Sequence, residues 1–230
     1  MASSETPTLE VTDLPRLALP IVDLIADKQP DIIIGCDRGA RLFTLAVKAM
    51  WRELHQKPLP TLDHTIRFTR VKSNYTGRKM LKKDLTDIFQ SYSEPINELV
   101  GERALRMLFI DDWMQTGAGR DAITDTLSGM PYDITPYFGM MIGTKGDAIG
   151  KQIDQLDVDV SFKDNSKQLG IDYKWHGGAD QTPFAVRHPD ALESRRSLYE
   201  AARILGATIR QTTAEEQGLT EIESQISLRA

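Results

Sequence analysis

The sequence predicts an α/β fold in which a parallel, twisted sheet is flanked by helices. Apolar runs at residues 31–35 and 105–110 are each followed by a glycine-containing turn and then by helical periodicity. The order strand, helix, strand occurs twice, around residues 31–69 and again around 105–142. Such units form parallel sheets with right-handed crossovers, and ligands bind at the carboxyl ends of their strands. Both glycine turns are predicted at such ends.

The composition is that of one domain with a substantial core. The chain has 230 residues, of which 40% are hydrophobic. We expect a single domain over residues 1–230, with a core at about 13–162 and a small hood and C-terminal helical extension at about 163–230. A formal net charge of −5 argues against nucleic acid or an anionic membrane as the main partner. The lone Cys36 cannot form a disulfide or a thiolate metal cluster within one chain.

Location and assembly follow from what the sequence contains. No apolar run reaches the length of a membrane span, and residues 1–10 lack the features of a signal peptide, so we expect a cytoplasmic protein. The polar extension at residues 212–230 carries Ile222 and Ile226 and is a candidate oligomer interface. We therefore expect a homo-oligomer.

Periodicity predicts the remaining elements. A helix is expected after Asp13, with Pro15 in its first turn. Further helices are expected at residues 42–54, 80–90, 121–127, 144–155 and 194–205. Strands are expected at residues 66–69, 134–142 and 158–162, and residues 91–101 form a connection with room for a short helix.

Residues 108–120 carry the strongest functional pattern in the chain. An apolar strand leads into Asp111 and Asp112, and a Thr-Gly-Ala-Gly turn begins at Thr116. Glycines let backbone N–H groups approach a phosphate, and the following helix adds its positive N-terminal end. The two carboxylates suit ribose hydroxyls or the hydration shell of a magnesium ion. Together these features predict a site for a phosphorylated ribose.

Two basic loops accompany this pattern. Arg38 and Arg41 flank a glycine directly after the first strand, where they suit a diphosphate. Residues 70–79 form a polar, basic stretch around Tyr75, which suits a long loop that closes over a ligand and excludes water. The alternative for this stretch is an ordinary solvated loop.

These motifs resemble those of the type I phosphoribosyltransferases, over roughly residues 30–145. The resemblance implies that Asp111 and Asp112 hold the ribose hydroxyls of phosphoribosyl diphosphate and take part in binding Mg²⁺. It implies that the 5′-phosphate is wrapped by Gln115, Thr116, Gly117, Ala118, Gly119 and Arg120. The family's diphosphate loop is matched by Asp37, Arg38, Gly39 and Ala40. Asp111, Asp112 and Arg38 are accordingly the candidate catalytic residues.

The resemblance extends toward the hypoxanthine-guanine and xanthine branch. Its Arg-x-Lys-Ser-Tyr segment is similar to residues 70–75, which implies a closing role for Lys72, Ser73 and Tyr75, although Asn74 interrupts the match. A hood residue would stack on the base, for which Tyr173 or Trp175 are candidates, and Lys174 would contact an exocyclic oxygen. Trp175 is equally suited to a place in the hood core.

Two positions depart from that branch. Gln115 stands where an aspartate normally receives a proton near the base N7, and an amide cannot act as a general base. Gly119 replaces a common threonine. The resemblance implies transfer of the phosphoribosyl group to a nucleobase, first of all a purine as in purine salvage, with release of diphosphate. The alternatives are a non-catalytic sensor of phosphoribosyl diphosphate or a nucleotide, and a same-fold enzyme acting on another substrate. The acceptor remains open.

Overall fold

The computed structural model describes residues 10–37, 40–71, 75–114, 118–143, 155–156, 171–174, 184–187 and 189–227. Side chains are described for residues 10–36, 40–71, 76–111, 118–139 and 193–215.

The centre of the fold is a parallel sheet, as the sequence predicts. Its strands are β1 (Ile32–Asp37), β2 (Ile66–Arg70), β3 (Leu105–Met114) and β4 (Ile134–Gly143), with a two-residue β5 (Gln155–Leu156) beside β4. The strands lie in the order β2-β1-β3-β4-β5, and every neighbouring pair is parallel. From β1 the chain therefore moves to β2 on one side, and it then crosses back over β1 to β3 on the other side.

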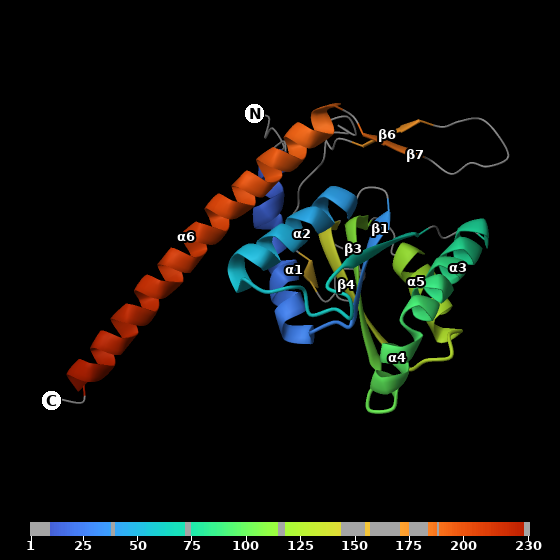
Figure 1. The fold of residues 1–230 in the computed structure, drawn as a ribbon, viewed down its shortest axis with the longest axis horizontal. Coiled ribbons are helices and arrows are strands. Elements are labelled where there is room, and N and C mark those ends of the chain that lie inside the picture. The colour runs from blue at the N-terminus through green and yellow to red at the C-terminus, as the bar shows by residue number, and fades with distance from the viewer. Residues whose placement is uncertain are drawn as a thin grey trace, which may run out of the picture.

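Helices cover both faces of this sheet (Figure 1). One face carries α1 (Leu14–Lys28), preceded by a 3₁₀ turn at Val11–Asp13, and α2 (Ala40–His55). The other face carries α3 (Tyr75–Ser91), α4 (Ser93–Val100) and α5 (Ala118–Ser128). This division follows from the strand order, because right-handed crossovers in opposite directions place their helices on opposite faces.

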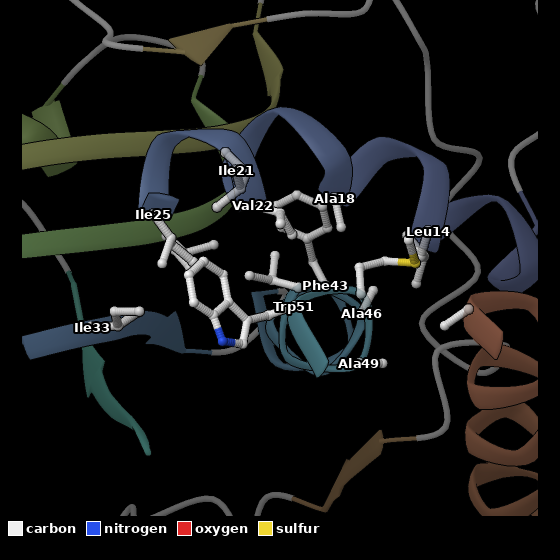
Figure 2. Close-up of a cluster of buried hydrophobic side chains, with 14 of the residues drawn as sticks. Leu14, Ala18, Ile21, Val22, Ile25, Ile33, Phe43, Ala46, Ala49 and Trp51 are labelled. Carbon is white, nitrogen blue, oxygen red and sulfur yellow. The ribbon is translucent and has the colours of Figure 1, made fainter. Parts of the chain in front are cut away.

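The core beneath α1 and α2 shows how helical spacing produces packing. On α1, Leu14, Ala18, Ile21 and Ile25 recur every three or four residues and are almost fully buried. Figure 2 shows these side chains facing Phe43 and Trp51 of α2, with Ile33 of β1 nearby. The indole Nε1–H of Trp51 donates to the Pro58 carbonyl at 2.9 Å, so this large ring is buried without an unsatisfied donor.

A long helix follows the core. The sequence suggested a helix at residues 194–205 and a separate extension, but the structure has one continuous α6 (Pro189–Ser227). Leu198 and Ala202 of α6 are fully buried against the cluster that contains α2, and the helix then runs well past the core (Figure 1). Gly206 permits this close approach, because a Cβ there would lie 2.6 Å from Glu53 Cβ. Within the described part of the chain, no helix combines the length and apolarity needed to cross a membrane.

The hood region is described in two short strands. They are β6 (Ile171–Lys174) and β7 (Phe184–Arg187), which pair antiparallel. The helix expected at residues 144–155 and the strand expected at 158–162 lie outside the described residues, except that Gln155 belongs to β5.

Three elements are longer than predicted at the ends that adjoin the predicted ligand loops. The strand expected to end at residue 110 continues through Met114, since β3 goes on pairing with β4 beyond its apolar part. The helix expected from residue 121 begins at Ala118, and the one expected from residue 80 begins at Tyr75. The regular elements thus extend closer to the predicted ligand loops than their apolar patterns indicated.

A buried ion pair joins β1 to β3 at the amino edge of the sheet. Asp31, whose side chain is 7% exposed, accepts two hydrogen bonds from the Arg103 guanidinium at 2.6 and 2.7 Å and one from the Arg106 backbone N–H at 2.8 Å. Burial by itself would raise the pKa of the Asp31 carboxyl, but these hydrogen bonds and the two arginine charges hold it below its usual 3.8.

We predict that Asp31→Asn lowers the free energy of unfolding by about 2 kcal/mol at pH 7. Because the folded-state pKa is depressed, the carboxylate contributes its stability above the unfolded value of 3.8 and loses it as the pH falls through the folded value. Urea denaturation at pH 7 and at progressively lower pH should therefore show the two proteins converging in acid.

The matched control is Asp27→Asn, since Asp27 is 69% exposed and pairs only with its neighbour Lys28 among the ion pairs described. Its effect should be close to zero at every pH. A difference between wild type and Asp31→Asn that does not change with pH would contradict the proposed role of the carboxylate.

Candidate functional site

The candidate site lies where the strand order reverses. β1 and β3 are neighbours, with Gly35 paired to Ile110 one or two residues before the predicted ligand motifs begin. α2, which follows β1, and α5, which follows β3, lie on opposite faces of the sheet. Open α/β sheets bind ligands in the crevice outside such a reversal. The described ends of the two predicted motifs, Asp37 and Ala40 in one and Asp111 and Ala118 in the other, therefore flank the same reversal.

Asp111 and Asp112 belong to β3 itself. Asp111 pairs with Met140 of β4, and its side chain is partly exposed. It shares the strand face of Phe109, which is the face covered by α3 and α5. Asp112 is the next strand residue, and its side chain lies outside the described part. The predicted strand ended at residue 110, directly before the two acids, whereas β3 continues through both and so fixes their backbone.

The first turn of α5 supplies the described part of the predicted phosphate cradle. It contains Ala118, Gly119 and Arg120. The first N–H groups of a helix have no intrahelical acceptor and favour an anion. The Arg120 guanidinium lies 5.6 Å from the Phe138 ring, against β4. Arg120 is therefore packed on the sheet while its backbone stands at the start of the helix.

The carboxyl end of β2 meets this turn. Arg70, the last residue of β2, is in register with Asp37 of β1. A Cβ added to Gly119 would lie 3.4 Å from a methyl group of Val71, so the segment after β2 touches the start of α5. The sequence predicted a long loop at residues 70–79. The structure corrects this prediction, because α3 already begins at Tyr75. An ion pair of 2.9 Å between Arg78 and Asp125 also links α3 to α5.

The structure also identifies a supporting contact that sequence reasoning missed. The Phe68 ring of β2 lies across Gly35 of β1, where a Cβ would come within 2.7 Å of the ring. The Arg41 guanidinium lies 5.2 Å from the centre of the same ring. Arg41 is thereby held beside the predicted diphosphate loop. Two features of the sequence could have indicated this contact. They are a glycine inside a buried strand and the position of Phe68 in β2, where apolar and polar residues alternate.

The other predicted residues are placed only in part. Asp37 ends β1, and the buried Ala40 begins α2. Tyr75 begins α3, and Lys174 ends β6, where it pairs with Phe184. Several predicted residues lie outside the described ranges, namely Arg38, Gly39, Lys72, Ser73, Gln115, Thr116, Gly117 and Trp175. Tyr173 belongs to β6, but its side chain is not among those described. Cys36 is buried in β1.

A second group of interacting polar side chains lies at the amino end of β2 and is structural in character. Tyr92 donates to Asp63, Arg67 donates to the Tyr92 oxygen at 2.6 Å, and Thr65 donates to Asp63 at 2.6 Å. Burial would raise the pKa of Asp63, but the hydrogen bonds from Thr65 and Tyr92 and the Arg67 charge lower it. Perturbed groups can mark active sites, but this cluster closes upon itself at the amino end of β2.

The described residues contain no group of three or more His, Cys, Asp or Glu side chains arranged to hold a metal ion. The donor chemistry of the site nevertheless fits magnesium, which is commonly held by one or two carboxylates together with substrate phosphates. The partly exposed Asp111 is a suitable donor of this kind.

Comparison with models of known protein families gave no match, and comparison with curated protein sequences also gave none.

We predict that Gly35→Ala weakens binding of inorganic diphosphate several-fold. The added methyl group needs the space of the Phe68 ring, so the ring and the Arg41 guanidinium resting on it must shift. Isothermal titration calorimetry would measure the affinity, with circular dichroism as a check on folding. The control is Gly101→Ala, where the new Cβ would meet only carbonyl oxygens at 3.8 Å or more. Equal affinities in wild type and Gly35→Ala would exclude this supporting role.

Proposed function

We propose that the chain is a phosphoribosyltransferase, which transfers the 5-phosphoribosyl group from phosphoribosyl diphosphate to a nucleobase and releases diphosphate. One observation carries the proposal. The parallel pairing of β1 with β3 supports it, because the carboxyl ends of these strands, at Asp37 and at Asp111 and Asp112, lie at one edge of the sheet, followed by α2 and α5. Phosphate, ribose and diphosphate need three adjoining subsites, and these segments supply chemistry suited to each.

The roles follow the chemistry of each segment. The N–H groups at the start of α5, with the preceding loop, would receive the 5′-phosphate. Asp111 and Asp112 would accept hydrogen bonds from the ribose hydroxyls. Arg38, assisted by Arg41, would neutralise the diphosphate. Asp111 and Asp112 would also hold Mg²⁺, which supplies positive charge to the leaving diphosphate.

The reaction is a substitution at C1 of the ribose. A base nitrogen forms the new bond while the bond to the diphosphate oxygen breaks, through a transition state with oxocarbenium character. Protein groups in such a site mainly position the partners and stabilise the charge on the leaving group. The segment after β2 lies against the start of α5, where it can shield the sugar from water.

The acceptor is proposed to be a purine, on the strength of the sequence of residues 70–77. Gln115 cannot remove a proton from the base, though it can hydrogen-bond a base edge. The same substitution favours a second candidate, a protein that binds phosphoribosyl diphosphate or a nucleotide as a signal without turning it over. The two candidates differ in whether diphosphate is released.

The test is release of diphosphate from phosphoribosyl diphosphate and Mg²⁺, with hypoxanthine, guanine, xanthine, adenine, uracil or orotate as acceptor. We expect turnover with a purine and a loss of at least about a hundredfold in Asp111→Asn/Asp112→Asn, because two ribose hydrogen bonds to charged groups are weakened. Asp87→Asn is the matched control, since Asp87 is exposed on α3, and it should leave turnover unchanged.

The outcomes separate the candidates. Turnover with one base would identify the acceptor. Tight binding of phosphoribosyl diphosphate in calorimetry without product from any base would rule out nucleobase transfer and favour the sensor. Failure to bind at all would refute both.

A further inference from the structure

A second candidate site lies at the opposite edge of the sheet. An open cavity of about 360 Å³ is lined by the last turns of α2, the connection from α2 to β2 and one residue of α6. Since α2 runs back from the carboxyl end of β1, its C-terminal end and the following connection stand at the amino edge. The cavity is thus separate from the candidate phosphoribosyl site. Its volume lies in the usual range for small-molecule sites.

The lining is cationic. Lys48, Arg52 and Lys57 all line the cavity, and none of its lining residues is a carboxylate. This concentration is notable in a chain whose net charge is −5. Favourable interaction with the helix C-terminus would explain Arg52, which is in the last turn of α2, but not Lys57, which follows the helix.

Glu53, the carboxylate that pairs with Arg52, does not cancel this charge. Glu53 lies 3.2 Å from Arg52, but it also lies 3.8 Å from Arg210 of α6, whose guanidinium donates to the Glu53 backbone carbonyl as well. One negative charge is therefore shared between two arginines. Among the ion pairs described, Lys48 and Lys57 take part in none.

The rest of the lining includes the rings of Trp51 and Tyr199 and the imidazole of His64. Trp51 lies in the cavity wall, with the Lys57 ammonium 5.7 Å from its ring, and Tyr199 of α6 adds a second ring that is 39% exposed. His64 Nδ1 lies 2.7 Å from the Leu59 carbonyl, which can only accept. Nδ1 must therefore carry the hydrogen, and Nε2 is left as the other hydrogen-bonding atom of the ring.

We propose that this cavity binds a small molecule that carries a phosphate monoester and a flat ring, such as a nucleoside monophosphate. The phosphate would sit among Lys48, Arg52 and Lys57, because converging cations are what a dianion requires. The ring would lie toward Tyr199. A ligand there joins α2 to α6, and so connects the core to the long C-terminal helix.

The test uses the indole N–H signal of Trp51 in ¹⁵N nuclear magnetic resonance spectra of the full chain. The chain has three tryptophans, and spectra of Trp113→Phe and Trp175→Phe identify the remaining signal. Adenosine monophosphate, guanosine monophosphate and inorganic phosphate are titrated separately, each against potassium chloride of matched ionic strength. We expect a saturable shift of the Trp51 signal, with at least one nucleotide binding more tightly than phosphate.

Two double variants make the test specific. Lys48→Gln/Lys57→Gln should weaken binding by at least about tenfold, since two charge-assisted contacts are lost. Lys82→Gln/Lys83→Gln removes the same charge from exposed positions on α3, across the sheet, and should bind like wild type. Circular dichroism would verify that each variant is folded.

Three results would overturn the proposal. They are a Trp51 signal that none of the three anions moves, a shift that chloride reproduces, and an affinity that Lys48→Gln/Lys57→Gln leaves unchanged. A shift with inorganic phosphate equal to that with both nucleotides would refute the ring contact. Because Trp51 reports on the amino edge, each of these outcomes is independent of whether Asp111→Asn/Asp112→Asn abolishes turnover.

Discussion

The parallel pairing of β1 with β3 is the constraint on which the rest of the structure depends. Both strands are covered on each face, so their apolar residues serve two cores at once: Ile33 and Leu108 face α1 and α2, while Ile34 and Phe109 face α3 and α5. The pairing also makes the chain reverse its direction across the sheet. A reversal leaves two neighbouring strands whose following loops diverge, and that divergence opens the place for a ligand.

The two edges of the sheet carry different kinds of polar chemistry. At the amino edge, Asp31 is held by Arg103, and Asp63 is held by Tyr92, in closed sets of hydrogen bonds. The Asp31 set joins the starts of β1 and β3, and the Asp63 set joins β2 to Tyr92 between α3 and α4. At the carboxyl edge the motif residues are a partly exposed Asp111 and the first turn of α5, whose hydrogen-bonding groups suit a ligand. The perturbed pKa values of Asp31 and Asp63 therefore mark closed hydrogen-bond sets at the amino edge and not the predicted ligand motifs.

The sequence predicted the parts of the fold that depend on local patterns. The buried strands follow from apolar runs, and the helical faces of α1 and α2 follow from spacing. The start of α3 could not be predicted in this way, because Tyr75 to Lys79 are polar and carry no stripe that distinguishes a solvated helix from a loop. Likewise, nothing local marks Asp111 and Asp112 as strand residues, since their strand conformation depends on pairing with β4.

The features that the sequence analysis did not predict depend on contacts between residues that are distant in the sequence. The packing of Phe68 over Gly35 needs the register of β1 with β2, and the cationic cavity needs α2 to stand beside a helix some 150 residues away in the sequence. Neither arrangement has a short-range signal.

The extended elements change how the candidate site would work. With β3 reaching Met114 and α5 starting at Ala118, only three residues connect them, so the cradle is set by two regular elements more than by a flexible loop. The connection from β2 to α3 has four residues, and Val71, the first of them, lies near Gly119. Short connections order fewer residues when a ligand binds, so less conformational entropy opposes binding. A site of this form would depend mainly on donors that the regular elements hold in place before the ligand binds.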